Sequence, residues 1–200
     1  MPYVSLPDYK SWLRNELGTI DDAILQASLD AAEVSVNEHC GRSFDVAAGS
    51  STREYRPESE RLVIIDDCTS VTSVVENGAP VAASGYQLEP LNGRRRSGLA
   101  VPYDQIRRIH GDWYIDFVNE VGRATISVTA TWGWAATPAP VIEATKILAK
   151  DIASQRDTRN GVAAFGEFGS LRVRLNPYVD QLLAPFIKST ATTVDFIGVF

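Results

Sequence analysis

The sequence predicts an α+β protein in which helices and strands are segregated along the chain. Helical patterns occupy residues 5–40, strand patterns fill the middle, and helical patterns return after Trp134. Segregation of this kind is typical of α+β folds, whereas regular alternation of strands and helices would indicate a parallel sheet. We therefore expect a helical-bundle core of two helical hairpins, with an inserted antiparallel β-rich subdomain and an extended C-terminal tail.

The composition allows a sizeable core. The chain has 200 residues, of which 44% are hydrophobic, enough for one domain or two small ones. The expected parts are an N-terminal helical hairpin (1–51), a β-rich insertion (52–136), C-terminal helices that complete the helical core (137–188) and a C-terminal tail (189–200).

Two helix patterns open the chain. Ser5 and Asp8 form a capping pattern, after which apolar residues recur at helical spacing until Gly18. A second apolar face follows within residues 19–40 and ends before Gly41, which is typical of a helix C-terminus. Because the connection is tight, we expect the two helices to pack against each other as a hairpin.

Strand patterns fill the middle of the chain. The clearest alternation of apolar and polar residues spans 124–132, and Asn77-Gly78 is typical of a tight hairpin turn. The predicted strands are 62–65, 71–76, 86–89, 113–117 and 124–132, with a loop at 92–103.

The helical period returns in the last third. We expect one helix over 141–157 and another from Asn176-Pro177, which Pro185 kinks or shortens. Between them, a glycine-rich connection (161–169) leads to an alternating run at 171–175 that is typical of a lone strand.

Charge and cysteine content exclude several classes of protein. The net charge of −6 argues against a protein that grips nucleic acid across its surface. No apolar stretch approaches the roughly 20 residues needed to cross a bilayer, and no secretion signal opens the sequence. Two cysteines cannot form a disulfide framework, so we expect synthesis in a reducing cytoplasm.

Four residues have the side chains of metal ligands: His39, Cys40, Cys68 and His110. Structural zinc sites use closely spaced ligand pairs, and here only His39 and Cys40 are adjacent. Neighbours on a helix point about 100° apart and rarely bind one ion. We therefore expect no metal, with Cys40 in the core and His39 at a helix end.

Carboxylates are the main candidates for catalysis. Asp66, Asp67, Asp112 and Asp116 form two pairs of the type that holds Mg²⁺ in nucleases. Both pairs lie at predicted strand ends, where aspartate commonly forms turns. Neither a nucleophile-elbow nor a phosphate-loop motif is complete. The sequence therefore favours a protein without catalytic residues or cofactors.

Three tryptophans indicate a third class, a plain binding module. Trp113, Trp132 and Trp134 could form aromatic platforms for a carbohydrate or a protein. Core packing is the competing interpretation for at least two of them.

Basic residues are concentrated in the second half of the chain. We interpret them as residues that form salt bridges with a partner or a neighbouring subunit, because aromatic residues are not interleaved with them as in single-strand binders. The candidates are Arg94, Arg95, Arg96, Arg156, Arg159, Arg172 and Arg174.

The C-terminal tail is rich in serine and threonine and then apolar. Apolar residues at a chain end either fold back onto their own domain or dock on another subunit. The candidate docking residues are Val194, Phe196, Ile197, Val199 and Phe200.

Several short stretches, taken in order, resemble one known family. They lie at 8–13, 21–25, 40–44, 71–74, 131–134, 141–157, 165–167 and 176–185. Together they cover most of residues 5–187 and resemble the head–tail connector, or head-completion adaptor, proteins of long-tailed bacteriophages. The β-rich middle is longer than in the smallest members of that family.

The resemblance implies a structural role in the virion. Such adaptors assemble in the host cytoplasm as a homo-oligomeric ring of about twelve copies beneath the portal protein. The ring extends the DNA channel and forms the docking platform for the stopper or tail, and the DNA passes through the lumen without specific binding. No membrane is involved. The resemblance also favours the portal as the partner of the apolar C-terminal segment, and it implies that the basic residues named above contact a neighbouring subunit or face the phage tail.

Two alternatives remain open from the sequence. A tail-terminator or other tail-completion protein would bind the tail tube and not the portal. An Mg²⁺-dependent DNA-processing enzyme would use the four aspartates named above.

Overall fold

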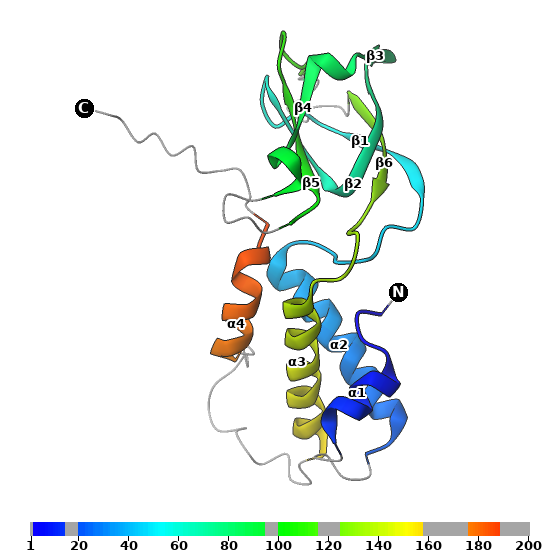
Figure 1. Ribbon diagram of the computed structural model, residues 1–200, viewed down its shortest axis with the longest axis vertical. Coiled ribbons are helices and arrows are strands. Elements are labelled where there is room, and N and C mark those ends of the chain that lie inside the picture. Colours follow the sequence, from blue (N-terminus) through cyan, green and yellow to red (C-terminus); the bar gives the residue numbers. More distant parts are fainter. Residues whose placement is uncertain (1, 15–19, 95–99, 116–124, 158–175, 189–200) are drawn as a thin grey trace, which may run out of the picture. The chain divides into compact units, whose positions relative to one another are not determined.

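The computed structural model describes residues 2–14, 20–94, 100–115, 125–157 and 176–188, with the side chains of 155–157 left aside. The chain divides into two compact units. Ser43–Thr137 forms the sheet unit, and Pro2–Arg42 together with Pro138–Phe200 forms the helical unit. Figure 1 shows the elements of both.

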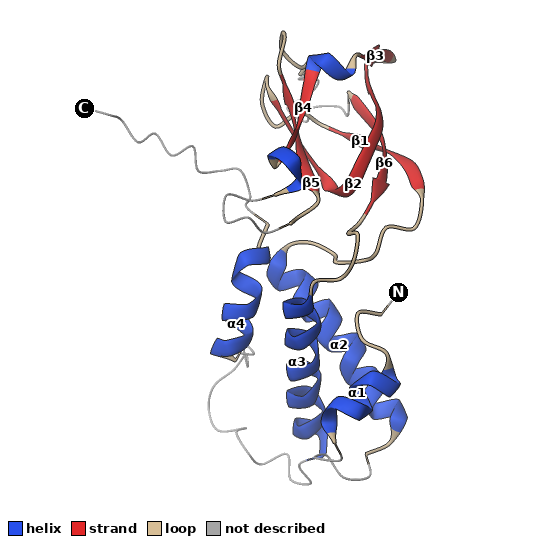
Figure 2. Cartoon of the chain, in the orientation of Figure 1, coloured by secondary structure: helices blue, strands red, loops and turns tan. Residues whose placement is uncertain are grey.

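Six antiparallel strands form the sheet unit (Figure 2). Their order is β1-β6-β2-β5-β4, and the short β3 pairs with β2 beside this path. The strands are β1 (Ser50–Tyr55), β2 (Leu62–Glu76), β3 (Ala79–Val81), β4 (Tyr86–Glu89), β5 (Tyr103–Arg108) and β6 (Ile126–Trp132). Short 3₁₀ turns flank β4 at Ala83–Gly85 and Leu91–Gly93.

The long strand β2 holds the sheet together. Its first part pairs with β5, from Leu62 to Cys68, and its second part pairs with β6, from Cys68 to Glu76. Cys68 is opposite Tyr103 on one side and Trp132 on the other. The register shifts on both sides of this strand, and such irregularities increase twist and bend a strand.

The core of the sheet unit follows from alternation. Along β6 every second side chain is buried, beginning with Ile126 and ending with Trp132, while the residues between them are half-buried. This is the pattern expected when one face of a strand packs on a core. The buried core residues are Val63, Ile65, Cys68, Val74, Ile106, Trp113, Ile126, Val128, Ala130 and Trp132.

Where it is described, the helical unit has four helices: α1 (Leu6–Leu13), α2 (Asp22–Cys40), α3 (Ala139–Asp157) and α4 (Pro177–Leu183), the last followed by a 3₁₀ turn at Ala184–Phe186. Helix α2 packs chiefly on α3, α3 also packs on α4, and α1 lies against α2. The buried residues of α2 are Leu25, Ser28, Leu29, Ala32, Val36 and Cys40. Those of α3 include Val141, Ala144, Leu148, Ala149 and Ala153.

Local capping fixes the helix ends. The Ser5 hydroxyl accepts a hydrogen bond from the Asp8 amide, as its capping pattern predicts. Asp21 and Asn176 cap α2 and α4 in the same way. Gly41 ends α2 with φ at 63°, and its N–H bonds back to the last turn, which confirms the predicted stop.

The expectation of a helical-bundle core made of two hairpins is wrong. The structure is a mostly antiparallel sheet of six strands, with its own core, together with four helices. Helix α1 does lie against α2, as predicted, but it buries only two of its residues, Tyr9 and Leu13. So short a helix cannot cover the stripe of α2, which packs on α3 instead.

Two strands escaped prediction because their sequences are polar. Strand β1 reads SSTREY and is exposed along almost its whole length, and β5 reads YDQIRR with only Ile106 fully buried. Pairing with β6 and β2 makes them strands, since their own residues show no apolar alternation.

Other strand predictions were partly right. The runs at 62–65 and 71–76 belong to one continuous strand, β2, while 86–89 is β4 as predicted. Trp113 reaches the core from outside any strand, and the rest of the run at 113–117 is not a strand where it is described. The run at 171–175 lies outside the described residues.

Candidate functional site

The four side chains with metal-ligand chemistry do not converge. Cys40 and Cys68 are fully buried in the helical and sheet units respectively. Burial raises the pKa of the Cys40 thiol to about 11, although the nearby charge of Arg42 lowers it. The His39 Nε2 atom lies 3.7 Å from an Asp180 carboxylate oxygen. Within the described ranges, no three His, Cys, Asp or Glu residues are grouped to hold a metal.

The first pair of candidate catalytic carboxylates, Asp66 and Asp67, forms hydrogen bonds within the sheet unit. Asp66 and Asp67 lie inside β2, not at a strand end as predicted, and neighbouring strand residues point to opposite faces. Asp66 is exposed and accepts hydrogen bonds from Arg53 (2.7 Å) and the Tyr55 hydroxyl (2.8 Å). Asp67 is buried and accepts one from the Trp134 indole N–H at 2.8 Å.

Only one member of the second carboxylate pair, Asp112, lies among the described residues. Asp112 lies 3.3 Å from the Arg61 guanidinium, in an exposed ion pair. Asp116 lies outside the described residues.

All three candidate tryptophan platforms are core side chains. Trp113, Trp132 and Trp134 are 2%, 8% and 3% exposed. The Trp132 indole donates to the Ser51 carbonyl, and the Arg53 guanidinium lies 4.6 Å from the centre of its ring. Buried rings of this kind cannot stack on a ligand, so the aromatic-platform interpretation is wrong.

Most of the candidate docking residues lie outside the described part of the chain. Arg94 is exposed and its backbone pairs with Ala100. Arg156 belongs to α3, and its side chain is not described. The remaining candidates outside the described residues are Arg95, Arg96, Arg159, Arg172, Arg174, Val194, Phe196, Ile197, Val199 and Phe200.

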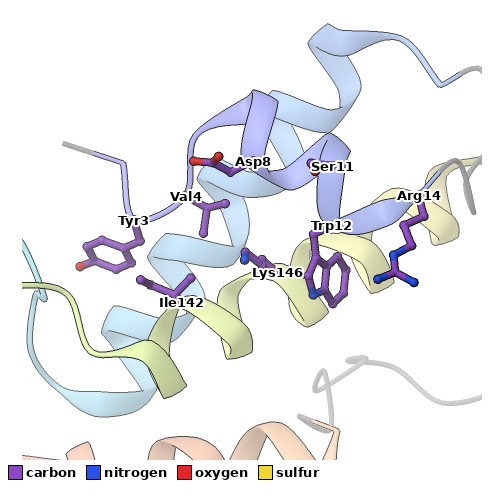
Figure 3. Close-up of a pocket in the computed structure, with 8 residues that line it drawn as sticks. All are labelled: Tyr3, Val4, Asp8, Ser11, Trp12, Arg14, Ile142 and Lys146. Atoms are coloured by element: carbon purple, nitrogen blue, oxygen red, sulfur yellow. The ribbon is translucent and has the colours of Figure 1, made fainter.

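The helical unit has a groove between α1 and α3, which sequence analysis did not anticipate. Its volume is about 410 Å³ (Figure 3). The N-terminal segment contributes Tyr3 and Val4 to its lining, and α3 contributes Ile142 and Lys146. We call this feature the α1–α3 groove.

Hydrogen bonds fix the apolar end of the groove. The Tyr3 hydroxyl donates to the Asn37 side-chain carbonyl at 2.7 Å, and the Tyr3 amide donates to Glu33 at 3.2 Å. Tyr3 and Val4 are buried at this end. The extended N-terminal segment is therefore tied to α2 and forms a fixed wall.

The other end of the groove combines an aromatic ring with charge. Trp12 is half-buried and stacks on Tyr9, with ring centres 6.2 Å apart. Figure 3 shows Trp12 between Lys146 of α3 and Arg14, which follows α1. The Asp8 carboxylate bonds to the Ser5 hydroxyl at the start of α1. The groove therefore combines the apolar side chains of Trp12 and Ile142 with polar ones, among them the cations Arg14 and Lys146.

One sequence signal pointed toward the groove. Trp12 lies beside the apolar stripe of α1 and not on it, so a large ring is placed at the edge of the buried face. The other walls could not be anticipated, because Val4 and Ile142 are far apart in sequence and meet only in the folded unit.

Comparisons with known proteins give structural relatives only. No family model and no curated protein sequence matches the chain. A chain in the neck of an empty gene transfer agent (GTA) particle, computed with C6 symmetry, is similar with a TM-score of 0.52 and 19% identity, over 94% of this chain and 90% of that chain. A chain in the virion of the native GTA particle has a TM-score of 0.49 and 22% identity over the same shares. At these identities the likeness concerns the fold.

A search of the described helices for a long apolar segment found none that could cross a bilayer.

Proposed function

We propose that this chain is a structural subunit of the neck of a tailed phage or phage-like particle, where it acts as the head–tail adaptor. The observation that carries the proposal is the similarity in fold, over nearly the whole of both chains, to a chain in a GTA particle neck. The ordered sequence stretches that resemble phage connectors support the same role independently.

A ring is the assembly that this role requires. The neck structure was computed with C6 symmetry, and a ring of about twelve copies is compatible with a sixfold axis because twelve is a multiple of six. Each subunit of a ring needs two different faces that match, since a heterologous contact closes only when it repeats around an axis.

Charge suits the proposed DNA channel. A subunit with a net charge of −6 does not attract phosphates over its whole surface, so DNA can move past it without being held. We assign portal and stopper or tail proteins as its partners. The apolar tail and the arginines of the second half are the proposed contacts within the assembly.

Co-purification with the portal protein encoded in the same genome tests the proposal. We expect a complex of a portal ring and an adaptor ring with equal copy numbers, because each adaptor seats on one portal subunit. Native mass spectrometry of the purified complex measures both numbers. In the control, the portal protein is mixed with an unrelated protein that carries the same affinity tag.

Failure to bind the portal at high concentration would contradict the adaptor role. Binding to the tail-tube protein in the same assay would then assign the chain to tail completion. Binding to neither would remove the head–tail proposal altogether.

A further inference from the structure

We propose that the α1–α3 groove receives the apolar C-terminal segment, residues 194–200, of a neighbouring copy of this chain. The presence of a neighbour rests on the ring of the proposed function. The groove and the segment both carry apolar side chains and have opposite charges, and the segment is long enough to reach a neighbouring copy.

The groove and the segment match in polarity. Ile142 and the Trp12 ring, both half-buried, supply exposed apolar surface at the groove, whereas Val4 is buried in its wall. The segment reads VDFIGVF, in which five of seven residues are large and apolar. A volume of about 410 Å³ lies in the range of sites that enclose small ligands, so it accommodates aromatic or aliphatic anchors.

The two also match in charge. Arg14 and Lys146 border the groove, and neither has an ion-pair partner among the residues that the structure describes. Asp195 is the only charged residue in the sequence from 189 to 200. The third charged residue of the lining, Asp8, already accepts a hydrogen bond from the hydroxyl of Ser5, the residue that caps α1. The cations are therefore available to the Asp195 carboxylate.

The end of the described chain favours a neighbour's groove. The Lys188 amide donates to the Cys40 carbonyl at 2.8 Å, which fixes where the tail leaves the helical unit, just after α4. Figure 1 shows α4 on one side of the α2–α3 pair and α1 on the other. Copies placed side by side bring the α4 side of one against the α1 side of the next, which is the heterologous contact that closes a ring.

The tail is long enough for this contact. Asp195 lies seven residues along the chain from Lys188. An extended chain spans about 3.3 Å per residue, so Asp195 reaches roughly 23 Å from Lys188. That distance exceeds the 8–10 Å that typically separates two packed helices, so the tail is long enough to reach a neighbouring subunit.

A peptide assay tests the groove without requiring a ring. The probe is a fluorescein-labelled peptide of residues 189–200, blocked at both ends, and the receptor is the chain truncated after Lys188. We expect saturable binding by fluorescence anisotropy. Trp12→Ala reduces the affinity about tenfold or more, because an aromatic anchor surface is lost. Lys146→Gln and Arg14→Gln each reduce it about two- to fivefold.

Lys10→Gln is the matched control for the charge variants. Lys10 lies on α1, does not line the groove and forms an exposed pair with Asp22 at 2.7 Å. Its replacement leaves peptide affinity unchanged. On the unmodified receptor, the Asp195→Asn peptide binds about two- to fivefold more weakly than the parent peptide. On the receptor with both Lys146→Gln and Arg14→Gln, the two peptides bind with the same affinity. That non-additivity identifies the ion pair.

A mixing experiment separates a neighbour's groove from the chain's own. A full-length chain with Trp12→Ala supplies only a tail, and the chain truncated after Lys188 supplies only a groove. We expect the two to associate when mixed, although neither self-associates through this contact. High dilution separates the copies from one another. If the full-length chain still does not bind the peptide at high dilution, each tail fills its own groove and the proposal is overturned.

Two further outcomes separate this inference from the proposed function. If the portal complex forms but the peptide does not bind the truncated chain, the groove proposal is overturned and the adaptor role stands. If the peptide binds and the portal complex does not form, the adaptor role fails and the groove remains a contact between copies.

Discussion

At the scale of single residues, Tyr9 of the helical unit combines a fully buried ring with a hydroxyl that lacks a hydrogen-bond partner among the described residues. Burial raises the pKa of the hydroxyl above its usual value of 10.0, and the charge of Asp151 raises it further. A buried donor without a partner costs stability, whereas the ring contributes to packing.

Tyr9→Phe should therefore leave the free energy of unfolding unchanged or raise it by up to about 1 kcal/mol. Urea denaturation followed by circular dichroism measures the change. Tyr9→Ala is the contrasting variant, and we expect it to cost about 3–5 kcal/mol because it empties the core position. A loss greater than about 1 kcal/mol in Tyr9→Phe would mean that the hydroxyl does have a partner.

Tyr9→Phe also changes how the free energy of unfolding depends on pH. Because the folded-state pKa of Tyr9 lies above the unfolded value of 10.0, the folded protein retains the proton longer. The stability that this difference provides is complete below pH 10 and is lost as pH rises toward the folded-state pKa. The free energy of unfolding of Tyr9→Phe should therefore fall less steeply above pH 10 than that of the parent chain.

At the scale of elements, the connection after β6 depends on one glycine. Gly133 has φ at 112°, and a Cβ atom there would lie 2.5 Å from the Asp45 carbonyl oxygen and 3.1 Å from the Ala47 nitrogen. Both contacts are with backbone, in the segment that the Trp134 amide and carbonyl bind. Only glycine allows the chain to pass so close to this segment.

Gly133→Ala should destabilise the protein more than Gly49→Ala. Gly49 also has a positive φ, 135°, but a Cβ there would meet nothing within 4 Å. Strain alone costs about 1–3 kcal/mol in Gly49→Ala. Gly133→Ala adds a steric term of about 1–3 kcal/mol. Equal losses in chemical denaturation would show that the close approach at Gly133 relaxes without cost.

Elements with strong local signals were predicted well. Helix α2 has a cap, a stripe and a glycine stop, and β6 alternates along its length, so each signal lies within the element itself. Strands β1 and β5 lack such signals, because their residues are polar and gain their hydrogen bonds from β6 and β2. Strand prediction fails where pairing supplies what sequence pattern does not.

The candidate sites show the same division. Cys40 was correctly expected in the core, because it lies on the apolar stripe of α2. Asp67 was expected in a turn, yet it is buried inside β2 and bonds to Trp134, a residue far along the chain. No pattern around Asp67 indicates that partner.

At the scale of the whole molecule, the sheet unit has what an autonomous domain needs. It has a core of ten buried residues. Hydrogen bonds also join its two ends: the Ala47 amide donates to the Trp134 carbonyl at 2.9 Å, and the Thr137 hydroxyl donates to the Phe44 carbonyl at 3.1 Å. Phe44 and Trp134 also pack together, with ring centres 5.2 Å apart.

A fragment of residues 43–137 should therefore fold alone. We expect dispersed amide signals in its NMR spectrum and cooperative urea unfolding. A fragment of residues 52–136, cut at the boundaries predicted from sequence, is the matched comparison. It lacks Phe44 and the start of β1, so it should unfold at a lower urea concentration. A disordered 43–137 fragment would show that the sheet unit depends on the helices.

The sequence by itself determined the caps at Ser5 and Asn176, the helix stripes, the hairpin turn at Asn77-Gly78 and the alternation of β6, because each depends on residues close together in the chain. The tertiary structure alone decided that β1 and β5 are strands, that α2 packs on α3, and that three tryptophans are core residues. It also formed the α1–α3 groove from Val4, Trp12 and Ile142. Those features depend on contacts between distant segments, which local periodicity does not encode.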